Sequence, residues 1–311
     1  MKAYAAFAKI YDHWQEAMGT PFSHLILPKL DRAVEKHHIK IDSMVDVACG
    51  TGILAIAMAE RGIRTFGIDL SEEMLKRAKA KVRGRKLPLT LSCQDMRSFR
   101  LPTGVELATC FFNSLNHLLT FEDLLNTFRS VHHALKNGGY FIFDLNNRRC
   151  FEALWTKTSI AHQEDFTLIM ENHFDPGNRR ARAFLTIFQR EGRAFRRDQD
   201  VIQERWFLDG EVRRALRRAG FQVVEKENFN PFRNLPFKGL KGFWVCRKVA
   251  KGEGGPASSQ KPSPQASSPS SSPGSSSKTS NPSGSSPSFW RYVRAAASPG
   301  KVRDGWANER E

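Results

Sequence analysis

The sequence predicts an α/β fold built on a doubly wound, mostly parallel sheet, into which an antiparallel β meander is inserted. Between residues 44 and 148, short apolar runs alternate with segments of helical periodicity, a pattern that indicates β-α-β units. The first apolar run leads into the glycine turn Gly50-Thr-Gly52, and the second ends on Asp69. Because such sheets bind ligands outside the carboxyl ends of their strands, both features indicate one ligand site.

The elements follow from the same periodicities. Residues 1–38 are expected to be helical, since apolar side chains recur there near helical spacing. Ser71 with two acids after it predicts a helix start, and Asn137-Gly138-Gly139 predicts a helix end. We expect helices at 53–61, 72–82, 121–136 and 209–220, and strands of one sheet at 44–48, 64–68, 89–93, 106–112, 139–145, 221–225 and 242–246.

The pattern changes after residue 150. From 151 to about 207, β-rich runs are separated by turn residues such as Asp175-Pro-Gly-Asn178, which predicts an antiparallel meander. Residues 251–311 are dominated by Ser, Pro and Gly, so this tail is expected to be disordered. The prediction is one domain over 1–250, with a helical cap at 1–40 and the meander as an insertion.

Composition narrows the classes of function. The net charge of +16 favours anionic partners such as phosphorylated metabolites or nucleic acid. No apolar run approaches the length of a membrane-spanning helix, and the N-terminus lacks the apolar core of a signal peptide. The five cysteines include no Cys-x-x-Cys pair. They predict buried free thiols, no metal site and a reducing, cytoplasmic location.

Three interpretations of the glycine turn compete. It is a purely structural turn, a dinucleotide site, or a site for S-adenosylmethionine. The dinucleotide fingerprint fits Gly50, Gly52 and Ala55, with Asp69 near the required offset. Asp46, however, lies four residues before Gly50, where a carboxylate would repel a pyrophosphate but suit an ammonium group. Asp69 suits the ribose of either ligand, so Asp46 favours S-adenosylmethionine.

Residues after the third strand add to this interpretation. Asp95 can accept the amino group of an adenine, and Met96 can cover the ring. With these residues in place, the stretch 44–145 resembles the class I S-adenosylmethionine-dependent methyltransferases. The resemblance rests on residues 46–52, 67–75, 95–96 and 111–117.

The resemblance implies a Rossmann-like seven-stranded sheet, an N-terminal helix that closes over the cofactor, and a meander that acts as a lid in small-molecule methyltransferases. It assigns cofactor binding to Tyr11, Asp46, Ala48, Gly50, Gly52, Asp69, Leu70, Asp95, Met96 and Phe112. Two positions depart from the family pattern. Ala48 stands where glycine is common, and Asn113 stands where many relatives carry an acid.

The predicted function is transfer of a methyl group to an N or O atom of a small molecule, which the basic charge allows to be anionic. Since alignment of the reactants supplies most of the catalysis, no universal catalytic residue is expected. His117, Asn113 and Tyr11 are the candidates. The alternatives are an RNA (tRNA) methyltransferase that uses the arginines of the meander, and a non-catalytic S-adenosylmethionine-binding module. An NAD-dependent oxidoreductase ranks last.

Overall fold

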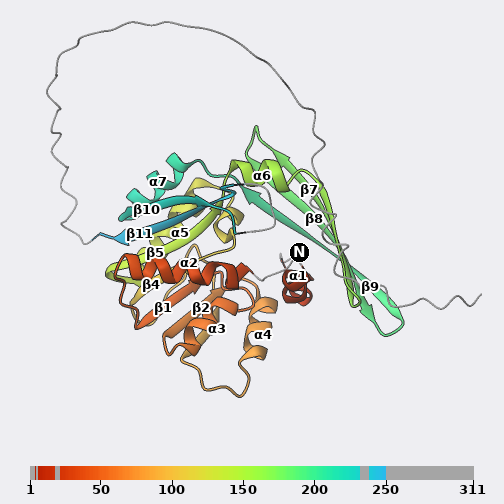
Figure 1. Cartoon of the computed structure of the whole chain (residues 1–311), viewed down its shortest axis with the longest axis horizontal. Helices are drawn as coiled ribbons and strands as arrows, with labels where there is room; N and C mark the ends of the chain where they lie inside the picture. The colour runs from red at the N-terminus through yellow and green to blue at the C-terminus, as the bar shows by residue number, and fades with distance from the viewer. Residues whose placement is uncertain (1–3, 5, 18–21, 232–237, 250–311) are drawn as a thin grey trace, which may run out of the picture. The chain divides into compact units, whose positions relative to one another are not determined.

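The computed structural model describes residues 4, 6–17, 22–231 and 238–249. All of them belong to one unit, Met1–Ala250. The tail that the sequence predicts to be disordered, 251–311, lies outside the described residues. Figure 1 labels most of the helices and strands of the described part.

A seven-stranded sheet forms the body of this unit, with the order β10-β11-β5-β4-β1-β2-β3. Its strands are β1 (Ser43–Val47), β2 (Arg64–Asp69), β3 (Leu89–Cys93), β4 (Val105–Cys110), β5 (Leu135–Asn146), β10 (Phe221–Phe229) and β11 (Lys241–Lys248). Only β11 runs antiparallel to its neighbours β10 and β5, and the other pairs are parallel. The predicted Rossmann-like, mostly parallel sheet is confirmed.

A second, four-stranded sheet is inserted between β5 and β10, and we call it the lid sheet. It contains β6 (Thr158–His162), β7 (Phe166–Asp175), β8 (Arg180–Glu191) and β9 (Ala194–Arg205), paired antiparallel in chain order. The sequence pattern had indicated the last three strands but not β6. Buried and exposed positions alternate along β8, as expected for a sheet with one covered face.

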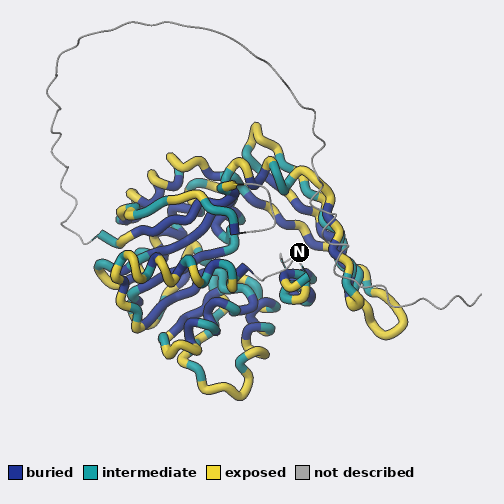
Figure 2. The backbone as a smooth tube through the Cα atoms, in the orientation of Figure 1, coloured by how far each residue is buried: buried dark blue, intermediate teal, exposed yellow. Residues whose placement is uncertain are grey.

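Successive side chains along the strands of the main sheet point to opposite faces, and they enter two separate cores. Val45 and Val47 enter the core beneath α5 (Phe121–Ala134) and α7 (Asp209–Arg218), whereas Met44 enters the core beneath α2 (Phe22–Lys36) and α3 (Ile53–Glu60). Figure 2 shows the buried strands between these more exposed helices. Burial on both faces explains why the strands are continuous apolar runs in the sequence.

One predicted helix start is confirmed, and one predicted helix end is wrong. Ser71 accepts a hydrogen bond from the backbone N of Met74 and caps α4 (Glu72–Lys81), as expected. The predicted stop at Asn137-Gly138-Gly139 is wrong, because α5 ends at Ala134 and β5 already begins at Leu135. These glycines lie inside β5, where Gly138 has a φ of +73° and the pairing with β4 shifts register. The glycines allow a strand irregularity here instead of a helix cap.

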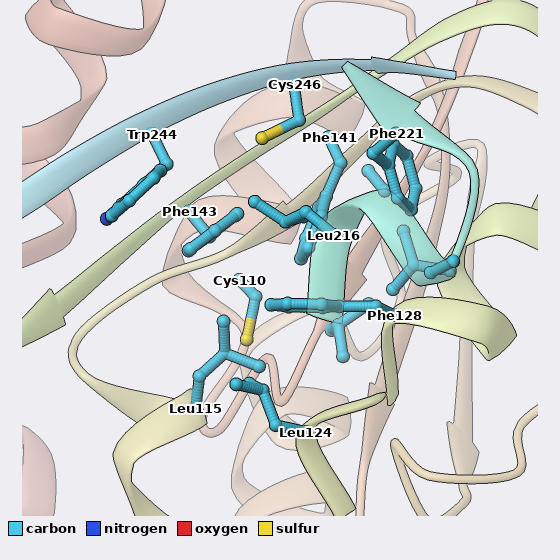
Figure 3. Close-up of a cluster of buried hydrophobic side chains, with 14 of the residues drawn as sticks. Cys110, Leu115, Leu124, Phe128, Phe141, Phe143, Leu216, Phe221, Trp244 and Cys246 are labelled. Atoms are coloured by element: carbon cyan, nitrogen blue, oxygen red, sulfur yellow. The ribbon is translucent and has the colours of Figure 1, made fainter. Parts of the chain in front are cut away.

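The cysteines are free thiols, as predicted, but they are not all buried. Cys110, Cys150 and Cys246 are buried, Cys49 is half-buried and Cys93 is exposed at the end of β3. Figure 3 shows the thiols of Cys110 and Cys246 among the aromatic rings beneath α5 and α7. The described residues contain no cluster of metal ligands, and none of their helices is long and apolar enough to cross a membrane.

The glycine turn yields a test of the fold. Gly52 has a φ of +78°, and an added Cβ would lie 2.9 Å from Cβ of Ala78. Gly50 has a φ of +57°, but an added Cβ there would meet no atom within 4 Å. Gly50→Ala should therefore cost about 1–2 kcal/mol of backbone strain, whereas Gly52→Ala adds about 1–3 kcal/mol of overpacking. Urea unfolding of both variants measures the difference, and equal losses of stability would contradict this account.

Candidate cofactor and methyl-transfer site

The glycine turn is fixed by the acid at the end of the next strand. Asp69 accepts hydrogen bonds from the backbone N of Gly50 at 2.8 Å, through Oδ2, and from the backbone N of Ser71 at 2.7 Å, through Oδ1. Ala48, the departure from the family pattern, adopts a φ of +57°. Each oxygen of Asp69 keeps a further lone pair for a ligand. Asp69 therefore shapes the turn and remains able to accept hydrogen bonds from a ribose.

Asp46 lies in β1, one strand away from Asp69, and is buried. Its Oδ1 accepts a hydrogen bond from Oγ1 of Thr109 in β4 at 2.8 Å, which leaves Oδ2 for a ligand. Burial raises the pKa of Asp46 to about 7, and burial also raises the pKa of Asp69. Both carboxyls are thus costly to ionise in the protein alone, so a nearby positive charge would stabilise them.

The residues expected at an adenine follow the carboxyl ends of the neighbouring parallel strands β2 and β3. Leu70 follows Asp69 and is 66% exposed, so it offers an uncovered apolar surface. Met96 packs against the core beneath α5. Asp95 already has a protein partner, because Arg97 donates to both of its oxygens, and these bonds lower the pKa of Asp95. Its contact with adenine remains a prediction.

The N-terminal cap is attached to the glycine turn. In α1 (Tyr11–Ala17), Asp12 accepts a hydrogen bond from Oγ1 of Thr51 at 2.6 Å and forms an ion pair with Lys81 of α4 at 2.7 Å. The ring of Tyr11 lies 6.4 Å from that of Phe112. Asp12 thus joins α1 to the glycine turn, and the neighbouring Tyr11 lies beside Phe112. The roles of Tyr11 and Phe112 in cofactor binding remain predictions.

Asn113 is the centre of a buried polar cluster at the ends of β4 and β5. It has a φ of 52° and begins η2 (Ser114–His117). Its backbone N donates to Asp144, its Nδ2 donates to Glu204 of the lid, and its Oδ1 accepts from Nζ of Lys241 at 2.9 Å. Lys241 also forms an ion pair with Asp144 at 2.7 Å. The amide therefore positions other groups and does not act as a base.

His117, at the end of η2, has a defined neutral form. Its Nδ1 lies 3.1 Å from the carbonyl O of Gln203, which can only accept, so Nδ1 carries the hydrogen. Nε2 then holds the lone pair and accepts from the hydroxyl of Tyr4 at 3.0 Å. Burial lowers the pKa of His117 to about 4. The imidazole is neutral at neutral pH, with its lone pair directed toward Tyr4 and Glu204.

Asp144, Asn146, Glu204 and Lys241 belong to this site and were not identified from the sequence. Two features of the sequence could have indicated Glu204 and Lys241. Glu204 lies on the alternation that buries Asp200 and Ile202 in β9, and Lys241 directly precedes the apolar run of β11. A charged residue on the covered face of a strand is rare without a partner or a function.

The geometry fits S-adenosylmethionine, which carries an ammonium group and a ribose but no phosphate. Asp46 supplies a buried carboxylate for the ammonium group, and Asp69 supplies free lone pairs for the ribose. The surroundings of Gly50, with no atom within 4 Å of an added Cβ, leave room for a ligand at the turn. A dinucleotide would bring its pyrophosphate toward Asp46, which argues against that alternative.

Comparison with known proteins agrees with this conclusion. Residues 44–139 match the family model of the methyltransferase domain. Putative methyltransferase YqeM of Bacillus subtilis (strain 168) is 31% identical over 222 residues, which cover 71% of this chain and 87% of the relative. A Streptomyces venezuelae enzyme, dTDP-3-amino-3,4,6-trideoxy-alpha-D-glucopyranose N,N-dimethyltransferase, is 29% identical over 185 residues, which cover 58% of this chain and 76% of that enzyme.

A solved structure matches most of the chain. The S-adenosylmethionine-dependent methyltransferase from Clostridium acetobutylicum ATCC 824 superposes with a TM-score of 0.66 at 26% identity, covering 79% of this chain and 99% of that chain. The chain belongs to the class I S-adenosylmethionine-dependent methyltransferases, and S-adenosylmethionine is its cofactor.

Proposed function

We propose that the chain transfers the methyl group of S-adenosylmethionine to a nitrogen or oxygen atom of a small molecule. The observation that carries the proposal is the polar cluster of Asn113, His117 and Glu204, which joins the carboxyl edge of the main sheet to the lid strand β9. The cofactor supplies an electrophilic methyl group with a good leaving group. The chain's own residues then have to align an acceptor and exclude water.

The cofactor contacts are proposed from their places in the structure. Asp46 would receive the ammonium group, Asp69 would receive the ribose hydroxyls, and the backbone at Ala48, Gly50 and Gly52 would pass beneath the ligand. Leu70, Asp95 and Met96 would surround the adenine. Tyr11 and Phe112 would close over the other end of the cofactor, since their rings already lie together.

A small acceptor is favoured over RNA by what the arginines contact. In the lid sheet and the turn before β8, Arg179 and Arg205 are paired with Glu211, and Arg196 is paired with Glu191 and Asp198. Acidic side chains of the protein therefore already neutralise these lid arginines, which leaves less positive charge there for an RNA backbone. The sugar substrate named for the Streptomyces relative is also a small molecule that carries phosphate groups. We therefore include anionic small molecules among the proposed acceptors.

Cofactor binding tests this proposal directly. Calorimetry with S-adenosylhomocysteine should show binding, and Asp69→Ala should weaken it by about 1–3 kcal/mol because a charge-assisted hydrogen bond is lost. Asp31→Ala is the matched control, since Asp31 is bonded to Arg61 on the exposed side of α2. That control should bind as the native protein does. A folded protein that binds no S-adenosylhomocysteine at millimolar concentration would refute the proposal.

A further inference from the structure

The polar cluster beneath the lid contains a carboxyl group with no permanent counterion. Lys241 and Asp144 neutralise each other through their 2.7 Å ion pair. Glu204 has only 2% of its side chain exposed, and its nearest basic group is His117, with Nε2 at 3.8 Å. His117 is neutral at neutral pH, as its lowered pKa indicates. Among the described residues, no lysine or arginine forms an ion pair with Glu204, and Lys241 lowers its pKa only from a greater distance.

One acceptor atom in the cluster also has no hydrogen-bond donor. Glu204 accepts from Nδ2 of Asn113 and, at 3.0 Å, from Nδ2 of Asn146. Oδ1 of Asn146 is buried, and no donor in the described part of the chain reaches it. An unpaired buried acceptor costs about 1–3 kcal/mol. An ammonium group at this place would stabilise the ionised form of Glu204 and would donate a hydrogen to Asn146.

The cluster lies at the same edge of the main sheet as the methyl-donor site. Asn113 follows β4 and Asn146 ends β5, at the carboxyl edge of the sheet that also carries Asp46 and the glycine turn. Glu204 approaches this edge from the last residues of β9. His117 keeps 25% of its side chain exposed beside Glu204.

The geometry points to Glu204, with Oδ1 of Asn146, as the binding site for the nitrogen of the methyl acceptor, so that the acceptor is a primary or secondary amine. This inference rests on the proposed methyl transfer and narrows it from nitrogen or oxygen to nitrogen. An amine enters as an ammonium ion, which would form an ion pair with ionised Glu204 and donate a hydrogen bond to Oδ1 of Asn146. A neutral hydroxyl would supply only the hydrogen.

The transfer step balances with this assignment. The bound ammonium gives one proton to the Glu204 carboxylate, which frees the nitrogen lone pair. That pair forms the new N–C bond while the S–C bond breaks, and its electrons stay on sulfur to leave a neutral thioether. The positive charge thus passes from sulfur to the methylated nitrogen. Burial raises the pKa of Glu204 to about 8, which suits a group that takes and returns a proton near neutral pH.

The missing counterion has a consequence for stability. Because the pKa of Glu204 is raised from 4.5 to about 8, the folded protein binds a proton that the unfolded chain loses between these pH values. The stability contributed by this proton is present below pH 4.5 and disappears as the pH rises to about 8. The groups that face Glu204 are His117, Lys241, Asp144, Tyr4 and Cys150.

Thermal unfolding of Glu204→Gln tests this part. All the other titrating groups are shared with the native protein, so the difference between the two melting temperatures reports on Glu204. The variant should gain stability relative to the native protein as the pH rises from 5 to 9. A difference that stays constant with pH would show that Glu204 is paired, and would overturn the inference.

Binding of the cofactor and of two analogues tests whether Glu204 binds an ammonium group. Sinefungin carries an ammonium group where S-adenosylmethionine carries the transferred methyl, and S-adenosylhomocysteine carries neither. In calorimetry, Glu204→Gln should weaken sinefungin by about 10- to 100-fold, because a charge-assisted hydrogen bond is lost. Its affinities for S-adenosylhomocysteine and S-adenosylmethionine should stay within about 2-fold of the native values. Glu211→Gln is the matched control, since that lid-proximal carboxyl already has Arg179 and Arg205 as partners.

The outcomes separate the two proposals. If no analogue binds to the folded native protein, the proposed methyl transfer fails, and the amine inference fails with it. If S-adenosylhomocysteine binds but Glu204→Gln leaves sinefungin unaffected, only the inference about the amine fails. If Glu204→Gln weakens S-adenosylmethionine as much as sinefungin, the carboxylate is the counterion of the donor's sulfonium. That result also overturns the assignment to the acceptor.

Discussion

The ion pair between Lys241 and Asp144 holds together the region where the lid meets the main sheet. Both side chains are almost fully buried, so removing either one would leave an unpaired buried charge that strongly destabilises the fold. Lys241 comes from the antiparallel strand β11 and Asp144 from β5, and together they bond both the backbone and the amide of Asn113. The left-handed backbone of Asn113 is maintained by these contacts, and its Nδ2 then points to Glu204. Asn113 is thus one of the residues that anchor the lid to the sheet, beside Asn146 and His117.

The N-terminal cap depends on the same lid strand. Asp200 of β9 accepts hydrogen bonds from the backbone N of Ala6 and of Phe7, four residues before Glu204 enters the polar cluster. Residues on one face of a strand recur every second position, so Asp200 and Glu204 point to the same side. That side carries the apolar core formed with Phe7 and Ile10. One lid strand therefore positions both the cover of the cofactor site and the polar cluster beneath it.

The parts of the site that could be predicted are those encoded by neighbouring residues. The turn at Gly50 and the acid Asp69 follow directly from strand ends, and the parallel sheet follows from continuous apolar runs. Glu204 and Lys241 escaped prediction because their partners are distant in sequence, at 91 residues from Asn113 and 97 residues from Asp144. No local periodicity reports such a pairing. The misassigned glycines Gly138 and Gly139 show that one local signal can have two structural meanings, because paired glycines occur both at helix ends and at strand irregularities.

Raised pKa values link the two ends of the site. Asp46, Asp69 and Glu204 are carboxyls whose pKa values burial raises, and no ion pair to any of them from a lysine or arginine is present among the described residues. A chain selected for stability alone would place neutral side chains at these positions, because unpaired buried carboxylates cost free energy at neutral pH. The cofactor brings an ammonium group and a sulfonium to this edge of the sheet, and an amine acceptor brings a further positive charge. The three carboxyls at this edge of the sheet have no lysine or arginine ion-pair partner in the described part of the protein alone. The reactants of an N-methyl transfer would bring positive charges to the same edge.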